Sequence, residues 1–153
     1  MRRFFLTLSL LSWFATAFAS ESVTGRVVKV LPLLLDSRGR DAVSPSLFDR
    51  DAYQVYLREH TNEVSAIRFD ILWKASNTGK EQLKLRLELR SVTTNSLPRQ
   101  TTLEQSVTPG YFGRWTTLTL SGADYKYLGE LVAWRATLWR DDRLISEQKS
   151  FLW

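Results

Sequence analysis

Two long stretches of the chain alternate between apolar and polar positions. In residues 67–74 the apolar positions are Ile67, Phe69, Ile71 and Trp73. In residues 83–90 leucine occupies every odd position, and the residues between are charged: Lys84, Arg86, Glu88 and Arg90. A period of two with one apolar face is typical of half-buried strands in antiparallel sheets.

The segment between these stretches predicts that they form one hairpin. Asn77-Thr78-Gly79 suits a three-residue loop, because such a loop favours glycine at its last position, where φ is positive. On the outer face, Asp70 then lies beside Arg86 and Arg68 beside Glu88, and both pairs are of opposite sign. The register on the core face pairs Trp73 with Leu83, Ile71 with Leu85, Phe69 with Leu87 and Ile67 with Leu89.

Residues 130–153 predict a second strand pair. Residues 140–143 form its turn, which pairs Leu138 with Ile145 and Trp139 with Leu144. Glu147 and Lys149 then fall on the core face of the last strand. Either they are inward charges that protect an edge strand from aggregation, or a bulge re-aims Phe151 and Trp153. The predicted core face of the first strand of this pair carries Val132, Trp134, Ala136 and Leu138, and its other face carries Ala133, Arg135, Thr137 and Trp139.

Further strands are expected on either side of these. Residues 101–108 and 113–120 flank Pro109-Gly110, a dipeptide typical of turns. Residues 25–36 predict a first strand, and Pro32 within it favours an edge position or a bend. Residues 121–130 predict a crossover loop with one helical turn.

The segment "SPSLFDRDAYQVYLREH", residues 44–60, differs from its surroundings. Ser44 can cap a helix and Pro45 suits the first helical position, so a helix is predicted over residues 45–59. Its apolar residues at helical spacing, expected to cover an open end or edge of the sheets, are Phe48, Ala52, Val55 and Tyr56. The competing interpretation is a strand with Tyr53, Val55 and Leu57 on one side.

Short strands, hairpins and one short covering helix predict a mainly β fold, an antiparallel β-sandwich. From Val64 to Trp153 the chain resembles immunoglobulin and fibronectin type III domains, in a tryptophan on an early central strand and in the tyrosine-rich approach "DYKYLGELVAW" to a penultimate strand. It is also similar to small exported bacterial proteins of unknown function that share this architecture. The cysteine pair of true immunoglobulin domains is absent. The resemblance implies a fold and no activity.

The first residues predict a secretory signal peptide. Arg2 and Arg3 precede an uncharged apolar run that ends in Ala17-Phe18-Ala19, so cleavage is expected after Ala19. A membrane anchor is the alternative, but the run is shorter than the roughly 20 residues that span a bilayer. One domain, residues 20–153, is then exported to the periplasm or beyond the cell.

Composition narrows the function classes. The chain has no cysteine, so packing alone must hold the exported domain together, and a hydrophobic content of 44% makes this feasible. The formal charge of +5 includes Arg2 and Arg3, and the other basic residues are interleaved with acidic ones. Such a mixed surface is not a phosphate-binding stripe, so nucleic acid is not an expected partner.

Little of the sequence suggests catalysis. His60 could act with Asp49 or Asp51, but a helix would point those two aspartates about 200° apart. A histidine near a helix C-terminus is more typically bonded to the last carbonyls. Catalytic cysteine, G-x-S-x-G, P-loop and metal-binding histidine-pair motifs are absent from the sequence. A non-enzymatic protein without cofactor or metal is expected, although a carboxylate pair formed only in three dimensions stays open.

Binding is the function that the sequence favours, with another envelope protein as the expected partner and a carbohydrate as the alternative. Aromatic side chains beside polar groups suit both ligands. A small outer-membrane barrel also alternates apolar and polar residues and can end in an aromatic residue such as Trp153, but Glu147 and Lys149 interrupt the required apolar stripe. The candidate surface comprises Trp139, Leu144, Arg135 and Gln148, with Tyr111 and Phe112 from the loop "PGYFGRW". The helix or the first strand could instead cover Trp139, and the loop aromatics could fold over the end of the sandwich.

Overall fold

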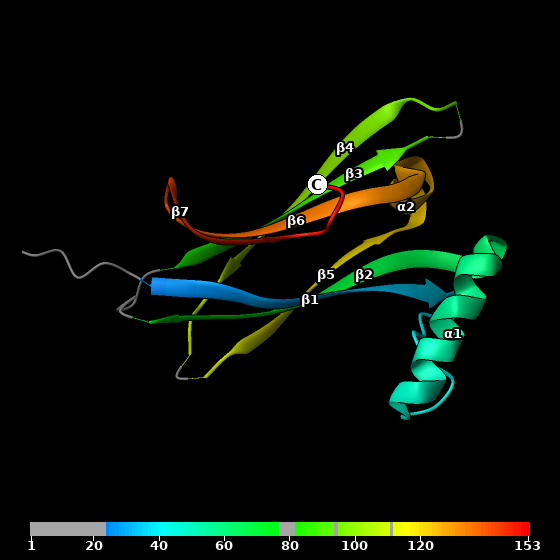
Figure 1. Cartoon of the computed structure of the whole chain (residues 1–153), viewed down its shortest axis with the longest axis horizontal. Coiled ribbons are helices and arrows are strands. Elements are labelled where there is room, and N and C mark those ends of the chain that lie inside the picture. Colours follow the sequence, from blue (N-terminus) through cyan, green and yellow to red (C-terminus); the bar gives the residue numbers. More distant parts are fainter. Residues whose placement is uncertain (1–23, 77–81, 94, 111) are drawn as a thin grey trace, which may run out of the picture.

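The computed structural model describes residues 24–76, 82–93, 95–110 and 112–153 (Figure 1). In this part of the chain, seven strands form two antiparallel sheets, with orders β1-β2-β5 and β4-β3-β6-β7. The prediction of an antiparallel β-sandwich is confirmed. The elements are β1 (Thr24–Asp36), α1 (Leu47–Glu59), the 3-10 helix η1 (Thr61–Glu63), β2 (Val64–Ser76), β3 (Leu83–Val92), β4 (Pro98–Val107), β5 (Arg114–Ser121), α2 (Gly122–Leu128), β6 (Glu130–Arg140) and β7 (Arg143–Lys149).

The strand order is immunoglobulin-like. Strands β1, β2 and β5 take the places of strands A, B and E, and β3, β6 and β7 take those of C, F and G. Strand β4 joins the second sheet beside β3. The buried tryptophan of the early central strand is Trp73 on β2, whose indole N–H donates to Thr116 Oγ1 at 2.8 Å. The rest of the core comes mainly from the facing sides of β2, β3 and β6: Ile67, Phe69, Ile71, Leu83, Leu85, Leu87, Leu89, Ala136 and Leu138.

The predicted hairpin of residues 67–90 is wrong. Strands β2 and β3 belong to different sheets, so Trp73 does not pair with Leu83. Their apolar sides meet across the core instead of edge to edge, and both arrangements require the same alternation of apolar and polar residues. The predicted outer pairs are also replaced: Arg68 contacts Asp41 and Asp70, Asp70 accepts from Thr117, Arg86 pairs with Glu104, and Arg135 pairs with Glu88. The predicted loop at residues 77–79 lies outside the described residues.

Strands β6 and β7 form the predicted pair, but with a bulge. Trp139 lies opposite Leu144 as expected, across a two-residue turn. The register shifts between Leu138 and Trp139, so Leu138 lies opposite Ser146 and not Ile145. Of the two explanations for the charges on β7, the bulge is therefore confirmed.

The bulge decides which side chains of β7 face outward. Glu147 now lies opposite Thr137 and Lys149 opposite Arg135, on the outer face. Gln148 lies opposite Ala136 on the core side, so its predicted place beside Trp139 is wrong. A second register shift on β6 turns Leu131 toward the core and leaves Val132 exposed, against the prediction.

Strand β1 is an edge strand, as Pro32 predicted. Two residues further on, the backbone N–H and C=O of Leu34 both bond to the side chain of Gln54 on α1. Because backbone direction alternates along a strand, Pro32 faces the same open edge, where its missing N–H costs no ladder bond. Helix α1 therefore closes part of this edge.

The helix is confirmed, but the face predicted to cover the sheet is wrong. Helix α1 starts after Ser46, whose hydroxyl accepts from the Asp49 N–H at 3.4 Å, so the cap is Ser46 and not Ser44. The buried residues are Gln54 and Leu57, whereas Phe48 is 80% exposed. The polar bonds that Gln54 makes to the open edge of β1 orient the helix, and these bonds turn the stripe of Phe48, Ala52, Val55 and Tyr56 outward.

The predicted helical turn of the crossover is α2. Leu128, the last residue of α2, is buried in the core, and the side chain of Tyr125 packs against the same core. Among the described residues, no helix is long and apolar enough to cross a membrane.

Candidate functional site

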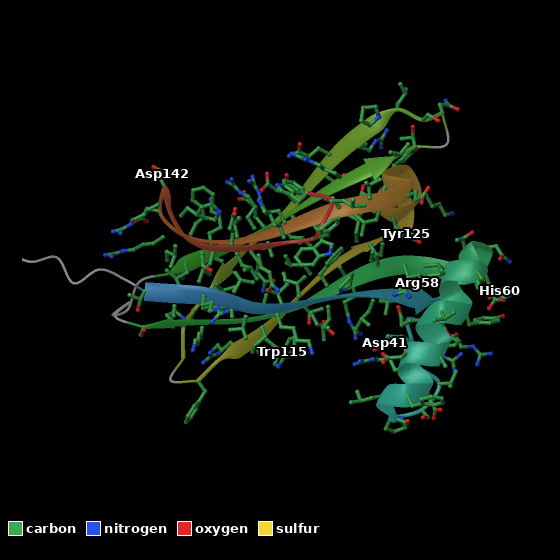
Figure 2. All side chains as sticks on the ribbon, in the orientation of Figure 1. Asp41, Arg58, His60, Trp115, Tyr125 and Asp142 are labelled. Atoms are coloured by element: carbon green, nitrogen blue, oxygen red, sulfur yellow. The ribbon has the colours of Figure 1, made fainter. Side chains whose placement is uncertain are left out.

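The structure does not bring His60 and the two aspartates together. The ring of His60 stacks on Tyr56 with centroids 4.0 Å apart, and its Nδ1 lies 2.9 Å from the Tyr56 carbonyl oxygen. His60 sits at the outer end of α1, where it bonds a last-turn carbonyl as predicted (Figure 2). Asp49 accepts from Ser44 Oγ, and Asp51 pairs with Arg50. Within the described residues, no group of three or more His, Asp or Glu side chains could hold a metal ion.

A buried carboxylate holds α1 to the end of β1. Asp36 accepts from the Arg40 guanidinium, the Tyr53 hydroxyl and the backbone N–H groups of Arg38 and Arg40, all between 2.8 and 2.9 Å. Burial by itself would raise the pKa of Asp36, but these hydrogen bonds outweigh it and lower the pKa to about 2. Burial and the bond to Asp36 raise the pKa of Tyr53.

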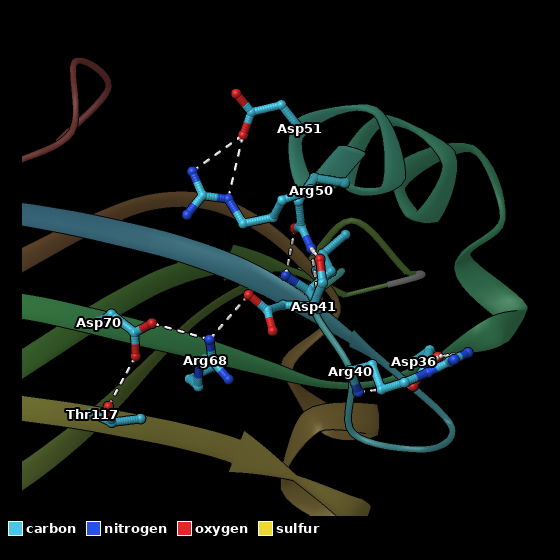
Figure 3. Close-up of polar contacts among 10 residues, drawn as sticks. Asp36, Arg40, Asp41, Arg50, Asp51, Arg68, Asp70 and Thr117 are labelled. Atoms are coloured by element: carbon cyan, nitrogen blue, oxygen red, sulfur yellow. Dashed lines mark hydrogen bonds and ion pairs between the residues drawn. The ribbon is translucent and has the colours of Figure 1, made fainter. Parts of the chain in front are cut away.

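A second polar cluster fastens the loop before α1 to the outer face of the three-stranded sheet (Figure 3). Arg68 on β2 pairs with Asp41 at 3.2 Å and with Asp70 at 3.1 Å, and Asp70 also accepts from Thr117 on β5. Both polar clusters consist of paired charges with short contacts. They position α1 and the loop before it.

The first candidate surface is the outward side of α1, here called the α1 stripe: Leu47, Phe48, Ala52, Val55 and Tyr56. All five residues are exposed, and Asp51 and Glu59 border them on the same side of the helix. Figure 1 shows α1 at one end of the sandwich, projecting beyond the sheets. The sequence pattern identified these residues except Leu47, but predicted that they would cover an end or edge of the sheets.

The second candidate surface is the outer face of the four-stranded sheet, here called the tryptophan face: Trp139, Leu144, Arg86, Arg90, Arg135 and Trp153. Trp139 is half-buried and Leu144 is 43% exposed. The Arg86 guanidinium lies 5.1 Å from the centre of the Trp139 ring, and the indole N–H donates to Thr137 at 2.8 Å. The prediction that Trp139 and Leu144 are cross-strand neighbours is confirmed. The side chain that lies over Trp139 is Arg86 from β3, and not a residue of α1.

Trp153 extends the tryptophan face along the sheet. The guanidinium of Arg90 lies 3.9 Å from the centre of its ring, and that of Arg135 lies 4.8 Å away. Each arginine on a tryptophan adds a cation–π contact of about 0.5 to 1 kcal/mol at an exposed site. The sequence prediction included Arg135 but missed Arg90 and Trp153, because they meet only where β3 pairs with β6 and Ser150 bonds the backbone of β6.

The remaining candidates lie apart from both surfaces. Phe112 is 86% exposed at the rim of an open pocket of about 590 Å³, and Tyr111 lies outside the described residues. Trp115, which sequence reasoning did not single out, is half-exposed beside Leu72 on the outer face of the other sheet (Figure 2). Because its side chain is so exposed, Phe112 does not fold over the end of the sandwich.

A groove opens where the two sheets diverge, between α1 and α2. Its volume is about 720 Å³, within the size range of small-molecule sites. Arg58 and Gln54 line it from α1, and Tyr125 lines it from α2 (Figure 2). Burial raises the pKa of Tyr125. The aliphatic part of the wall consists of Pro32, Leu34, Val64, Leu128 and Leu131.

No protein-family model and no curated protein matches the chain. A solved structure of an immunoglobulin-like protein from Pseudomonas aeruginosa is similar, with a TM-score of 0.36 and 18% sequence identity. The match covers 86% of this chain and 96% of that one. The fold assignment rests on the strand order itself.

Proposed function

We propose that this protein is an exported, non-enzymatic interaction module that binds a protein of the cell envelope through the α1 stripe. The observation that carries the proposal is the orientation of α1, whose apolar residues face solvent. Monomeric proteins rarely leave contiguous apolar side chains uncovered, and such patches commonly mark interaction sites. Export rests on the signal peptide predicted for residues 1–19.

The orientation of α1 is not that of a loosely attached helix. Gln54 bonds both backbone groups of Leu34, Tyr53 bonds Asp36, and Leu57 is fully buried. These contacts occupy one side of the helix and hold the other side toward solvent. Residues at i, i+4, i+7 and i+8, beginning at Phe48, are the anchors by which an amphipathic helix docks in an apolar groove.

Charge indicates the kind of partner. Asp51 pairs with Arg50, and the exposed Glu59 also borders the stripe, so the stripe does not attract anionic lipid headgroups. A protein groove with an apolar floor and basic residues at its rim fits better. The partner should therefore be a protein and not the membrane surface.

Carbohydrate binding has less support. A sugar needs a flat aromatic face, but Arg86 lies over Trp139, and Arg90 and Arg135 lie over Trp153. The rings of the tryptophan face are therefore partly covered by cations.

An affinity capture from envelope extract, with mass spectrometry, tests the proposal. Phe48→Ser should abolish capture of a specific protein, and the thermal melt should stay unchanged. Leu97→Ser is the matched control, since Leu97 is 62% exposed and lies in the loop between β3 and β4, away from α1. Equal capture by wild type and Phe48→Ser would refute the proposed role of α1.

A further inference from the structure

We infer that the partner of the α1 stripe is a second copy of this chain, and that the stripe docks on the tryptophan face of that copy. The inference rests on the proposed function and names its partner. Two different surfaces of one molecule carry it. Both contain large apolar side chains that are not fully buried, and the tryptophan face has an excess of bases, whereas the exposed acid Glu59 borders the stripe.

The charges of the tryptophan face complement those of α1. Along the outer side of the four-stranded sheet, Glu88 and Glu104 are already engaged by Arg135 and Arg86. Arg90 is exposed and lies over the Trp153 ring. Beside the α1 stripe, Asp51 pairs with Arg50, whereas the exposed Glu59 would meet an excess of bases there. The bases of this face are Lys84, Arg86, Arg90, Arg135 and Lys149, and its acids are Glu88, Glu104 and Glu147.

The α1 stripe is short enough to lie along the tryptophan face. From Phe48 to Tyr56 the stripe extends about 12 Å along the helix. From Ala133 to Trp139 the central strand of the tryptophan face extends about 20 Å. Trp139 and Leu144 lie at one end of this strand and Trp153 lies toward the other, so the helix can rest between apolar side chains.

The position of the surfaces determines the type of assembly. Helix α1 packs on β1 of the three-stranded sheet, whereas the tryptophan face is the outer side of the opposite sheet (Figure 1). One molecule can therefore use both surfaces at once. Such a head-to-tail contact joins molecules into a ring where the rotation between them closes, or into an open chain where it does not. A symmetric contact between two α1 stripes would instead bring Asp51 and Glu59 of both copies together.

Sedimentation velocity over a range of concentrations tests the inference. The wild-type chain should grow in mass with concentration, and high salt should weaken the association. Phe48→Asp removes one surface and Leu144→Asp removes the other, so each variant alone should associate at least about tenfold more weakly. Leu97→Asp, the control, should behave as wild type.

Sedimentation of a mixture of the two variants is the decisive measurement. Each variant keeps one intact surface, so an equimolar mixture of Phe48→Asp and Leu144→Asp should form a one-to-one dimer and nothing larger. A mixture that stays monomeric would overturn the inference. So would a wild-type chain that is monomeric at every concentration. If that monomer still captured an envelope protein in a Phe48-dependent way, self-association would fail and the proposed function would stand.

Discussion

The side-chain amide of Gln54 bonds both backbone groups of Leu34. Its Oε1 accepts from the Leu34 N–H at 2.8 Å, and its Nε2 donates to the Leu34 carbonyl at 2.9 Å. The same Nε2 also donates to the carbonyl of Asp41. One side chain thus takes the place of a neighbouring strand at the open edge of β1. It also joins β1, α1 and the loop between them.

Removing this amide should lower the free energy of unfolding by more than the loss of one surface side chain would. Gln54→Leu keeps the volume but leaves the Leu34 N–H buried without an acceptor, a loss of about 1 to 3 kcal/mol. Gln54→Glu keeps the acceptor, but at neutral pH it buries an ionised carboxylate beside the Leu34 and Asp41 carbonyl oxygens that now accept from Nε2, so its loss should be larger. Urea denaturation of the two variants measures the difference. Equal stability of Gln54→Leu and wild type would show that water replaces the amide.

The two sides of α1 should differ sharply in their contribution to stability. Leu57 is fully buried, so Leu57→Ala should destabilise the fold by about 2 to 5 kcal/mol. Phe48 is largely exposed, so Phe48→Ala should change the free energy of unfolding by no more than about 0.5 kcal/mol. Chemical denaturation checks both variants, and a large loss in Phe48→Ala would contradict the orientation of α1.

Asp36 should make stability depend on acid pH. Its pKa is about 2 in the folded protein, below the unfolded value of about 3.9, so the unfolded state binds the proton first as the pH falls. The stabilisation is complete above about pH 5 and is lost as the pH falls through about 2. After allowance for solvent screening, the loss should be about 1 to 2 kcal/mol.

Comparison of wild type with Asp36→Asn isolates this contribution. The variant should be less stable at pH 7, and the stability difference should shrink as the pH is lowered from 4 to 2. Unfolding free energies measured at several pH values provide the test. A difference that stays constant over this range would refute the low pKa of Asp36.

Gly129 should tolerate no side chain, because it connects α2 to β6 with φ +78° and ψ −153°, a conformation that only glycine adopts readily. A Cβ there would lie 2.4 Å from the Val92 carbonyl oxygen. Gly129→Ala should therefore destabilise the fold by more than about 3 kcal/mol, strain and overpacking together. Gly39→Ala is the control, since φ is +74° but nothing lies within 4 Å, and its loss should be about 1 kcal/mol. Similar melting temperatures for the two variants would contradict the close contact.

Local features of the chain were predictable without tertiary structure. The alternation around Trp73, the strands on either side of the turn at residues 140–143 and the helix over residues 45–59 all depend on neighbouring residues. Pro32 indicated an edge strand or a bend, because a missing N–H can be tolerated only where no ladder bond is needed. The class of fold followed from these elements.

Which strands become neighbours was decided only by the tertiary structure. Leu85 and Ile71 alternate with polar residues in the same way whether their strands pair edge to edge or face each other across a core. The register near Trp139 likewise depended on a bulge, which an alternating pattern does not reveal. The tryptophan face could not be predicted in full, because Arg90 and Trp153 are far apart in the sequence.

The orientation of α1 shows the same division between local pattern and tertiary contact. Its sequence contains an apolar side, with Phe48 and Val55, and a mixed side, with Gln54 and Leu57. Hydrophobicity alone favours burial of the first side. The sequence by itself therefore determined the helix, whereas the structure decided its buried side, because the unpaired edge of β1 at Leu34 required a donor and an acceptor that only Gln54 could bring to it.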